Sequence, residues 1–252
     1  MNRIKNAAKI TLLALGLASF QGQALLKSDT LAPAEKHTKE SQLVVSLISN
    51  LHYKESQLND EMSKQILDKY ISILDPNKMY FMSADILAFD AWQNQMDDFI
   101  KEGRLKPAYD IFNLFKIRMQ SRIDFALDML NKDMSFEADE AYQWDREKAE
   151  WPMDEKSLDS VWRKKVKNDY LSLKLVDKEP AKIKEILEKR YKLMSKRINE
   201  RKSDDVFQLY MNAYVSLIEP HTGYMGPRTS ENFEINMSLS LEGIGAILGN
   251  DG

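Results

Sequence analysis

Cysteine is absent from this sequence of 252 residues, and histidine occurs only three times. Without cysteine the chain can form no disulfide bond, no thiolate metal site, no cysteine nucleophile and no lipidated N-terminal cysteine. The three histidines, His37, His52 and His221, are far apart in the sequence and do not indicate a metal cluster. We therefore expect neither a metal nor a cofactor.

A surplus of basic residues is also absent. The chain has 36 lysines and arginines against 39 aspartates and glutamates, and 33 against 39 remain once residues 1–24 are removed. A net charge of −6 lacks the basic footprint that neutralises nucleic-acid phosphates, so we expect no nucleic-acid partner. With 43% hydrophobic and 30% charged residues, the composition is that of an ordinary soluble globular chain.

The first 24 residues have the pattern of an export signal. A basic n-region ends at Lys9, an apolar h-region follows over residues 10–20, and small residues up to Ala24 offer a cleavage site. The apolar run is shorter than the roughly 20 residues that a membrane-spanning helix needs. We therefore predict a signal peptide over residues 1–24, with an uncleaved membrane anchor as the weaker alternative.

Apolar residues recur at helical spacing through most of the chain between residues 36 and 219, which predicts about seven helices. The expected helices cover residues 41–54, 62–74, 83–103 and 105–130, followed by one capped by Asp154, one begun by Pro180 and one begun by Ser203, Asp204 and Asp205. Asp75-Pro76, Gly103 and Glu219-Pro220 are the expected helix ends. Residues 134–154 lose the periodicity and predict an ordered connection held by Phe136, Tyr142, Trp144 and Trp151.

A β-strand is predicted only after residue 236. Met237, Leu239 and Leu241 alternate with polar residues, and an apolar run broken by glycines follows. Within that run, the backbone N–H groups of Gly243, Ile244, Gly245 and Ala246 could bind the C-terminal carboxylate of a peptide that adds to the sheet edge. Taken alone, glycine in a strand more often marks a bulge.

Candidate catalytic groups are few, and each has a simpler structural interpretation. Ser63-Lys64 and Ser195-Lys196 could supply a nucleophile and a base, but adjacent helix residues do not face each other, so a solvated surface is favoured. His52 and Glu55 could form half of a metal site, although no third ligand is identifiable. His221 lies in a loop where it could be functional or simply a turn residue. No catalytic residue is predicted in this chain.

Five segments together resemble one known family, the tail-specific, or carboxy-terminal processing, serine proteases of bacterial periplasms. They are "YISILDPNKMYF" (residues 70–81), "WDREKAEWP" (144–152), "VKNDYLSLKL" (166–175), "EPHTGYMGPRTSENF" (219–233) and "MSLSLEGIGAIL" (237–248). They occur in the order that the family has, from about residue 40 to the end. Such ordered agreement is more specific than any single motif in the chain.

The resemblance implies a mainly α fold, with a multi-helix domain over residues 25–235 followed by the truncated first strand of a PDZ domain over residues 236–252. It implies a periplasmic endopeptidase that recognises apolar C-termini and cleaves by a Ser-Lys mechanism. Its catalytic part would lie beyond these residues, so this segment alone should be inactive. Gly243, Ile244, Gly245 and Ala246 become the expected carboxylate-binding loop.

The implied partners are protein substrates with apolar C-termini, a helical-repeat adaptor lipoprotein as in similar proteins, and a membrane surface bound peripherally. The alternative is a stand-alone periplasmic helical interaction module without enzymatic activity.

Overall fold

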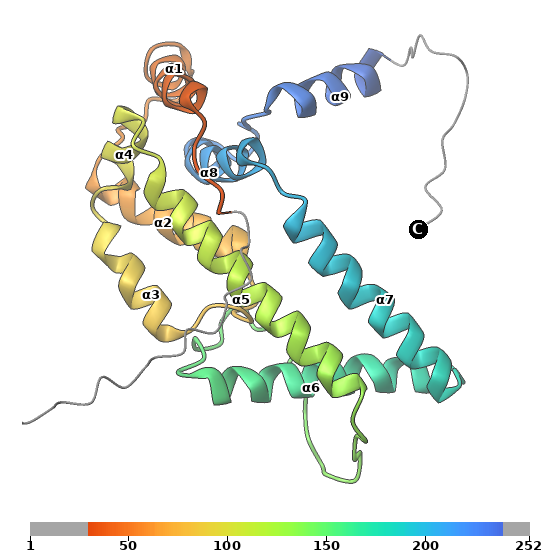
Figure 1. Ribbon diagram of the computed structural model, residues 1–252. Coiled ribbons are helices and arrows are strands. Elements are labelled where there is room, and N and C mark those ends of the chain that lie inside the picture. The colour runs from red at the N-terminus through yellow and green to blue at the C-terminus, as the bar shows by residue number, and fades with distance from the viewer. Residues whose placement is uncertain (1–29, 239–252) are drawn as a thin grey trace, which may run out of the picture.

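The computed structural model describes residues 30–238, and this part of the chain is helical without a β-strand (Figure 1). The helices are α1 (Glu35–Leu51), α2 (Asp60–Leu74), α3 (Ser83–Phe89), the short 3-10 helix η1 (Asp90–Trp92), α4 (Met96–Glu102), α5 (Lys106–Leu130), α6 (Glu155–Lys174), α7 (Pro180–Asn199), α8 (Ser203–Ile218) and α9 (Pro227–Ser238). The mainly α prediction is therefore confirmed over the described residues.

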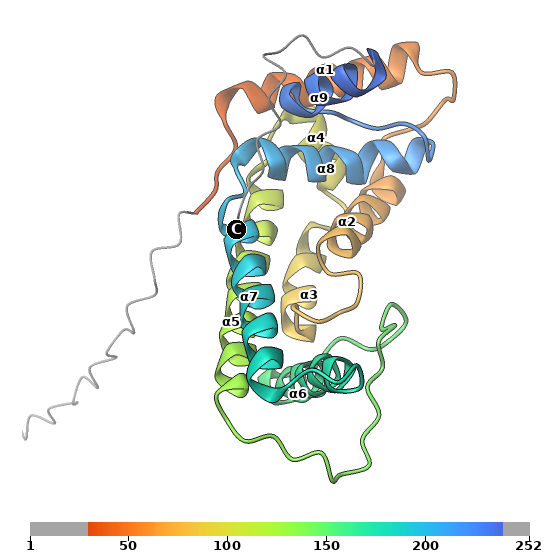
Figure 2. The same cartoon turned by 90° about the vertical axis from the view of Figure 1, so that its right-hand side faces the viewer.

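Helix α5 runs through the molecule and belongs to two hydrophobic cores (Figures 1 and 2). Its first half packs with α2, α4 and α8 in an upper core that includes the buried Tyr109 and Phe112. Its second half packs with α6 and α7 in a lower core that includes the buried Ile123 and Ala126. The apolar stripe of α5 extends over its whole length, so one helix fixes the two cores relative to each other.

Buried tyrosines tie the upper core together by their hydroxyl groups. Tyr70 of α2 donates to the carbonyl of Ala108 at 3.1 Å, and Tyr210 of α8 donates to the carbonyl of Met96 at 3.2 Å. The two rings meet edge to face with their centroids 5.3 Å apart. Each hydroxyl donates to a carbonyl in the first turn of another helix, so neither buried hydroxyl lacks a hydrogen-bond partner.

The loop after α2 connects the two cores. Trp162 of α6 is fully buried and donates its indole N–H to the carbonyl of Met79 at 2.7 Å. Asp75 follows the last residue of α2 and accepts hydrogen bonds from the N–H groups of Met79, Tyr80 and Phe81 at 2.7 to 2.9 Å. Burial nevertheless raises the pKa of the Asp75 carboxyl.

Most predicted helix limits are confirmed, and Asp154 caps α6 by accepting from the N–H of Ser157 at 2.8 Å. Pro180 is the first residue of α7, while α2 and α8 end directly before Asp75 and Glu219. Gly103 ends α4 in the left-handed region with φ +71°. A Cβ there would lie 2.5 Å from the side chain of Thr38, so this position requires glycine on two counts.

The single helix predicted over residues 83–103 is wrong, because the segment forms α3, η1 and α4. The break occurs where the N–H of Met96 donates to the Oγ of Ser63 at 2.8 Å instead of to a carbonyl of its own segment. A buried hydroxyl from α2 thus caps the start of α4. Helix α1 also begins six residues before the predicted start.

The strand predicted from residue 236 is not confirmed: residues 236–238 close α9, and residues 239–252 lie outside the described part of the chain. Pro227 starts this helix, as proline is favoured in a first turn. No α9 side chain is buried, so no core-facing stripe marks the helix in the sequence.

The connection over residues 131–154 crosses α6 without regular structure. Phe136 stacks on Tyr170 of α6 with centroids 5.4 Å apart, and Trp151 meets Phe81 edge to face. Trp144 is 78% exposed, so the prediction that it holds the connection to the helices is wrong.

Asp75→Ala should destabilise the chain by about 3 kcal/mol or more, because three loop N–H groups would lose their acceptor, two of them in buried residues. Urea unfolding followed by tryptophan fluorescence measures this loss. Asp68→Ala, at an exposed position of the same helix, is the control and should change the free energy of unfolding by less than about 0.5 kcal/mol. Equal losses in the two variants would contradict the role given to Asp75.

Candidate functional site

The predicted carboxylate-binding residues Gly243, Ile244, Gly245 and Ala246 lie outside the described residues. Their role stays a prediction. The other candidates from the sequence lie within the described residues. Ser63 is on α2, Ser195 is on α7, and His52 and His221 lie near the end of α8.

The serine-lysine pairs do not form catalytic pairs. Ser63 is buried, contrary to the solvated surface expected for it, and its hydroxyl accepts from the N–H of Met96. Ser195 donates to the Oε1 of Gln120 on α5 at 2.7 Å. Lys64 and Lys196 are exposed, and neither serine has a lysine ammonium as a hydrogen-bond partner among the described contacts. Both serines therefore join helices.

His52 contacts the loop that follows α8 rather than a metal site. Its Nε2 lies 3.0 Å from the Oγ1 of Thr222, and its Nδ1 accepts from the N–H of Lys54 at 3.1 Å. Between residues 30 and 238 no group of three histidine or acidic side chains could hold a metal ion. The proposed half-site of His52 and Glu55 thus gains no third ligand in that range.

His221 is a turn residue with its side chain 92% exposed. Its Nδ1 lies 2.6 Å from the Oε1 of Glu219, and its backbone N–H donates to the Oε2 of the same carboxylate at 2.8 Å. The hydrogen bond from the imidazole lowers the pKa of Glu219. This pair orders the turn after α8, which is the simpler of the two interpretations offered by the sequence.

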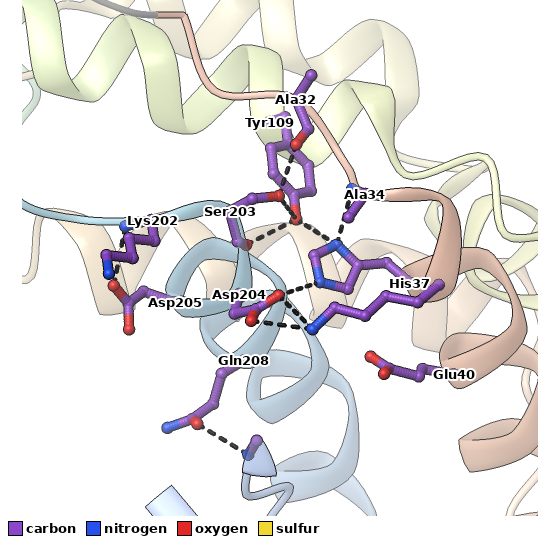
Figure 3. A network of polar contacts seen from close by, with 12 residues as sticks. Ala32, Ala34, His37, Glu40, Tyr109, Lys202, Ser203, Asp204, Asp205 and Gln208 are labelled. Atoms are coloured by element: carbon purple, nitrogen blue, oxygen red, sulfur yellow. Dashed lines mark hydrogen bonds and ion pairs between the residues drawn. The ribbon is translucent and has the colours of Figure 1, made fainter. Parts of the chain in front are cut away.

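A polar network joins the first turns of α1 and α8 (Figure 3). His37 of α1 is fully buried and stacks on Phe207 of α8, with ring centroids 4.4 Å apart and an interplanar angle of 1°. Its Nε2 lies 2.6 Å from the Oδ1 of Asp204. Lys36 binds the same carboxylate at 2.8 Å.

The hydrogen bonds define which imidazole nitrogen carries the proton. The N–H of Ala34 donates to His37 Nδ1 at 3.1 Å, so Nδ1 is an acceptor and the Nε2–H donates to Asp204. Tyr109 of α5 contacts Nδ1 at 3.0 Å and donates to the carbonyl of Ser203 at 2.8 Å. Hydrogen bonds from Lys36 and then from His37 hold the pKa of Asp204 below its usual range.

Serine, histidine and aspartate meet in this network without forming a catalytic triad. The Ser203 hydroxyl donates to the carbonyl of Ala32 at 2.5 Å and lies 3.1 Å from the Tyr109 hydroxyl, so it is not paired with His37. The imidazole is enclosed, and both of its nitrogens are engaged. A nucleophile needs a base within hydrogen-bond reach, and Ser203 has no such base here. The network is a structural joint.

The loop between α8 and α9, residues 219–226, is bonded back onto α8 beside this joint. Asn212 accepts from the N–H of Tyr224 at 2.8 Å and donates to its carbonyl at 2.9 Å. Gln208 accepts from the N–H of Gly226 at 3.0 Å and from the hydroxyl of Thr229 at 2.9 Å. We call this segment the exit loop, because the chain leaves α8 through it and α9 begins directly after it.

The exit loop also contacts α1 and the segment after it. The Tyr224 hydroxyl donates to the carboxylate of Glu40 on α1 at 3.5 Å, and Thr222 lies 3.0 Å from the Nε2 of His52. The Tyr224 ring meets Phe207 of α8 edge to face at 5.3 Å. Burial, with the nearby carboxylate of Glu40, raises the pKa of Tyr224 to about 12. The path of the chain beyond α8 is therefore fixed by side chains from two helices and a neighbouring loop.

Sequence reasoning missed this joint because its members are remote from one another. His37 and Asp204 are 167 residues apart, and His37 lay outside the helix predicted to begin at residue 41. Asp204 was expected only as a first-turn charge of the last helix. A motif at short spacing would have been detectable, but a pairing across this separation leaves no local signal.

Comparison with known proteins agrees with the resemblance noted in the sequence. Residues 44–228 match the family described as "Tail specific protease N-terminal domain". The chain belongs to the tail-specific protease family. It is 37% identical over 254 residues to the tail-specific protease of Haemophilus influenzae, and this alignment covers 97% of the chain but 36% of the relative.

The matched region includes the α5 and α8 members of the joint and the exit loop, whereas its α1 members, Lys36 and His37, precede the match. The chain spans about a third of the length of this relative and corresponds to its N-terminal segment. No helix between residues 30 and 238 is both long and apolar enough to cross a bilayer.

His37→Ala should destabilise the chain by about 3 kcal/mol, because it leaves a cavity beside Phe207 and an N–H of Ala34 without an acceptor. Urea denaturation at pH 7 measures the change. The matched control is His221→Ala. Because the His221 side chain is exposed, this substitution should change the free energy of unfolding by less than about 0.5 kcal/mol. A His37 variant as stable as the control would show that the joint does not hold α1 to α8.

Asp204→Asn should be less stable than the parent at pH 7, and this gap should close as the pH falls below about 4. The folded-state pKa of Asp204 is lowered from its ordinary value of 3.8, so its contribution is present above that value and is lost as the carboxylate becomes protonated. Unfolding midpoints of both proteins between pH 7 and pH 3 test this. A stability difference that does not change with pH would mean that the negative charge of Asp204 does not contribute to the stability of the fold.

Proposed function

We propose that the chain is the helical scaffold of an exported serine endopeptidase that recognises proteins by apolar C-termini. Membership of the tail-specific protease family carries the proposal. Cleavage would use a serine and a lysine in a part of the protein that follows these residues, and residues 239–252 would begin the PDZ domain that binds the substrate terminus. The signal peptide over residues 1–24 would direct the protein to the periplasm.

The geometry of the exit loop supports a scaffold role. Three hydrogen bonds with Gln208 and Asn212 hold the loop on α8, and a fourth joins Gln208 to Thr229 of α9. Helix α8 itself is held to α1 by the His37 joint. Helix α9 then extends away from the bundle (Figure 1) and has no buried side chain. A rigid departure point followed by an uncovered helix suits a domain that orients the next one. A helical-repeat adaptor lipoprotein would be a further partner of the complete enzyme.

The test compares the 252-residue chain with the complete polypeptide of the open reading frame that contains it. The complete polypeptide should cleave a reporter protein ending in apolar residues and spare the same reporter ending in two aspartates. The 252-residue chain should cleave neither. Proteolysis by the short chain, or none by the complete polypeptide, would contradict the proposal, and the second result would favour a helical interaction module without activity.

A variant of the complete polypeptide tests the scaffold role directly. Gln208→Ala combined with Asn212→Ala removes the side chains that hold the exit loop, and each lost hydrogen bond contributes about 1 kcal/mol. Cleavage of the apolar-tailed reporter should fall several-fold. Asn50→Ala is the control, because the Asn50 amide bonds only within α1, to Ser46. Equal activity in both variants would argue against orientation by the exit loop.

A further inference from the structure

The fold separates charges that are mixed in the overall composition. Residues 155–202, which form α6, α7 and their connections, carry 16 basic and 8 acidic residues. The rest of the described chain, residues 30–154 and 203–238, carries 16 basic and 28 acidic residues. The pair of α6 and α7 with the turn that joins them, here the basic hairpin, is thus strongly positive on an otherwise acidic molecule. The net charge of the whole chain conceals this.

The turn of the basic hairpin exposes apolar side chains. Leu175 is 83% exposed and Val176 is 61% exposed, while Leu171 on the last turn of α6 is 37% exposed. Figure 1 shows this turn at the lower right, at an outer end of the molecule and far from α1 and α8. Exposed apolar residues at the extremity of a basic element indicate a contact surface.

The backbone of the turn holds these side chains in place. The N–H groups of Val176 and Lys178 both donate to the carbonyl of Leu173 at 3.3 Å, and that of Asp177 donates to Lys174 at 3.1 Å. Asp177 adopts φ +57°, the left-handed conformation that ends many helices. Pro180 then starts α7. Leu175 and Val176 therefore project from an ordered turn.

We propose that the turn of the basic hairpin inserts into the surface of a bilayer that contains anionic phospholipid. The apolar side chains would enter the interface, and the basic residues of the hairpin would lie over the headgroups. Lys174 and Lys178 flank the apolar pair and are exposed. Asp177 and Glu179 also lie at the turn and offset these lysines in part, so other basic residues of the hairpin must add to the attraction.

A bilayer fits this surface better than a folded protein does. The apolar residues form a projecting turn, and a fluid interface accepts such a shape without a complementary pocket. The proposal names a surface and a lipid class for the peripheral association that the resemblance implied. It rests on the proposed export, which would place the chain beside a membrane, but its test requires neither export nor proteolysis.

Because the chain lacks cysteine, one introduced thiol can report the position of the turn. Leu175→Cys, labelled with a polarity-sensitive nitrobenzoxadiazole dye, is mixed with vesicles of phosphatidylglycerol and phosphatidylethanolamine. The label should brighten several-fold and shift to the blue, and it should not respond to phosphatidylcholine vesicles. Leu87→Cys carries the matched label on α3, where the side chain is 73% exposed, and should not respond to either.

The local label separates this surface from the apolar h-region of residues 10–20, which could bind vesicles by itself. Binding of the chain with an unchanged label at residue 175 would overturn the proposal. A response at residue 87 equal to that at 175, or equal responses to both kinds of vesicle, would do the same. A protein partner at this turn would leave the label unresponsive to lipid and would also count against it.

Charge and apolar variants test the two contributions separately in the labelled protein. Each basic residue near an anionic surface strengthens binding by a factor of about five. Lys174→Glu combined with Lys178→Glu should therefore weaken the label response at least about 25-fold in lipid concentration, and added salt should weaken it in the parent. Val176→Ser should reduce the maximal response. Insensitivity to both salt and charge reversal would overturn the electrostatic part and with it the choice of lipid.

Discussion

Helix α5 is the element on which the rest of the structure depends. Its 25 residues make a rod about 37 Å long, and its apolar face contributes to both hydrophobic cores. A shorter helix would leave α6 and α7 without a surface against which to pack. Because α5 is continuous, the upper core, the lower core and the basic hairpin keep one relative orientation.

The upper core supports a second level of organisation, in which polar contacts select one arrangement of helices that hydrophobic burial alone would not specify. The imidazole of His37 stacks on Phe207 as an apolar ring would, but its two nitrogens also require Ala34 and Asp204 in fixed directions. Hydrogen bonds with buried members tolerate little displacement, since an unpaired polar atom is costly in a medium of low dielectric constant. Because Asn212 and Gln208 hold the exit loop on α8, the position of the loop is fixed together with that helix.

Much of the fold could be predicted from local patterns. Asp154, Pro180, Gly103 and Asp75 mark helix ends by effects that act within one turn, and the structure places all four as expected. The break between α3 and α4 could not be predicted, because it depends on the Ser63 hydroxyl of a different helix. Helix α9 was missed because none of its side chains is buried, so its sequence lacks the periodicity that burial imposes.

The sequence by itself determined the helical class, the helix limits set by capping residues and, through ordered motifs, the family. These features depend on interactions between residues close in the chain or on the order of segments. Only the tertiary structure decided that His37 meets Asp204, that the exit loop is bonded to α8, and that basic residues gather on the hairpin of α6 and α7. Such pairings join positions whose separation in sequence carries no local signal, and they arise only when the helices pack.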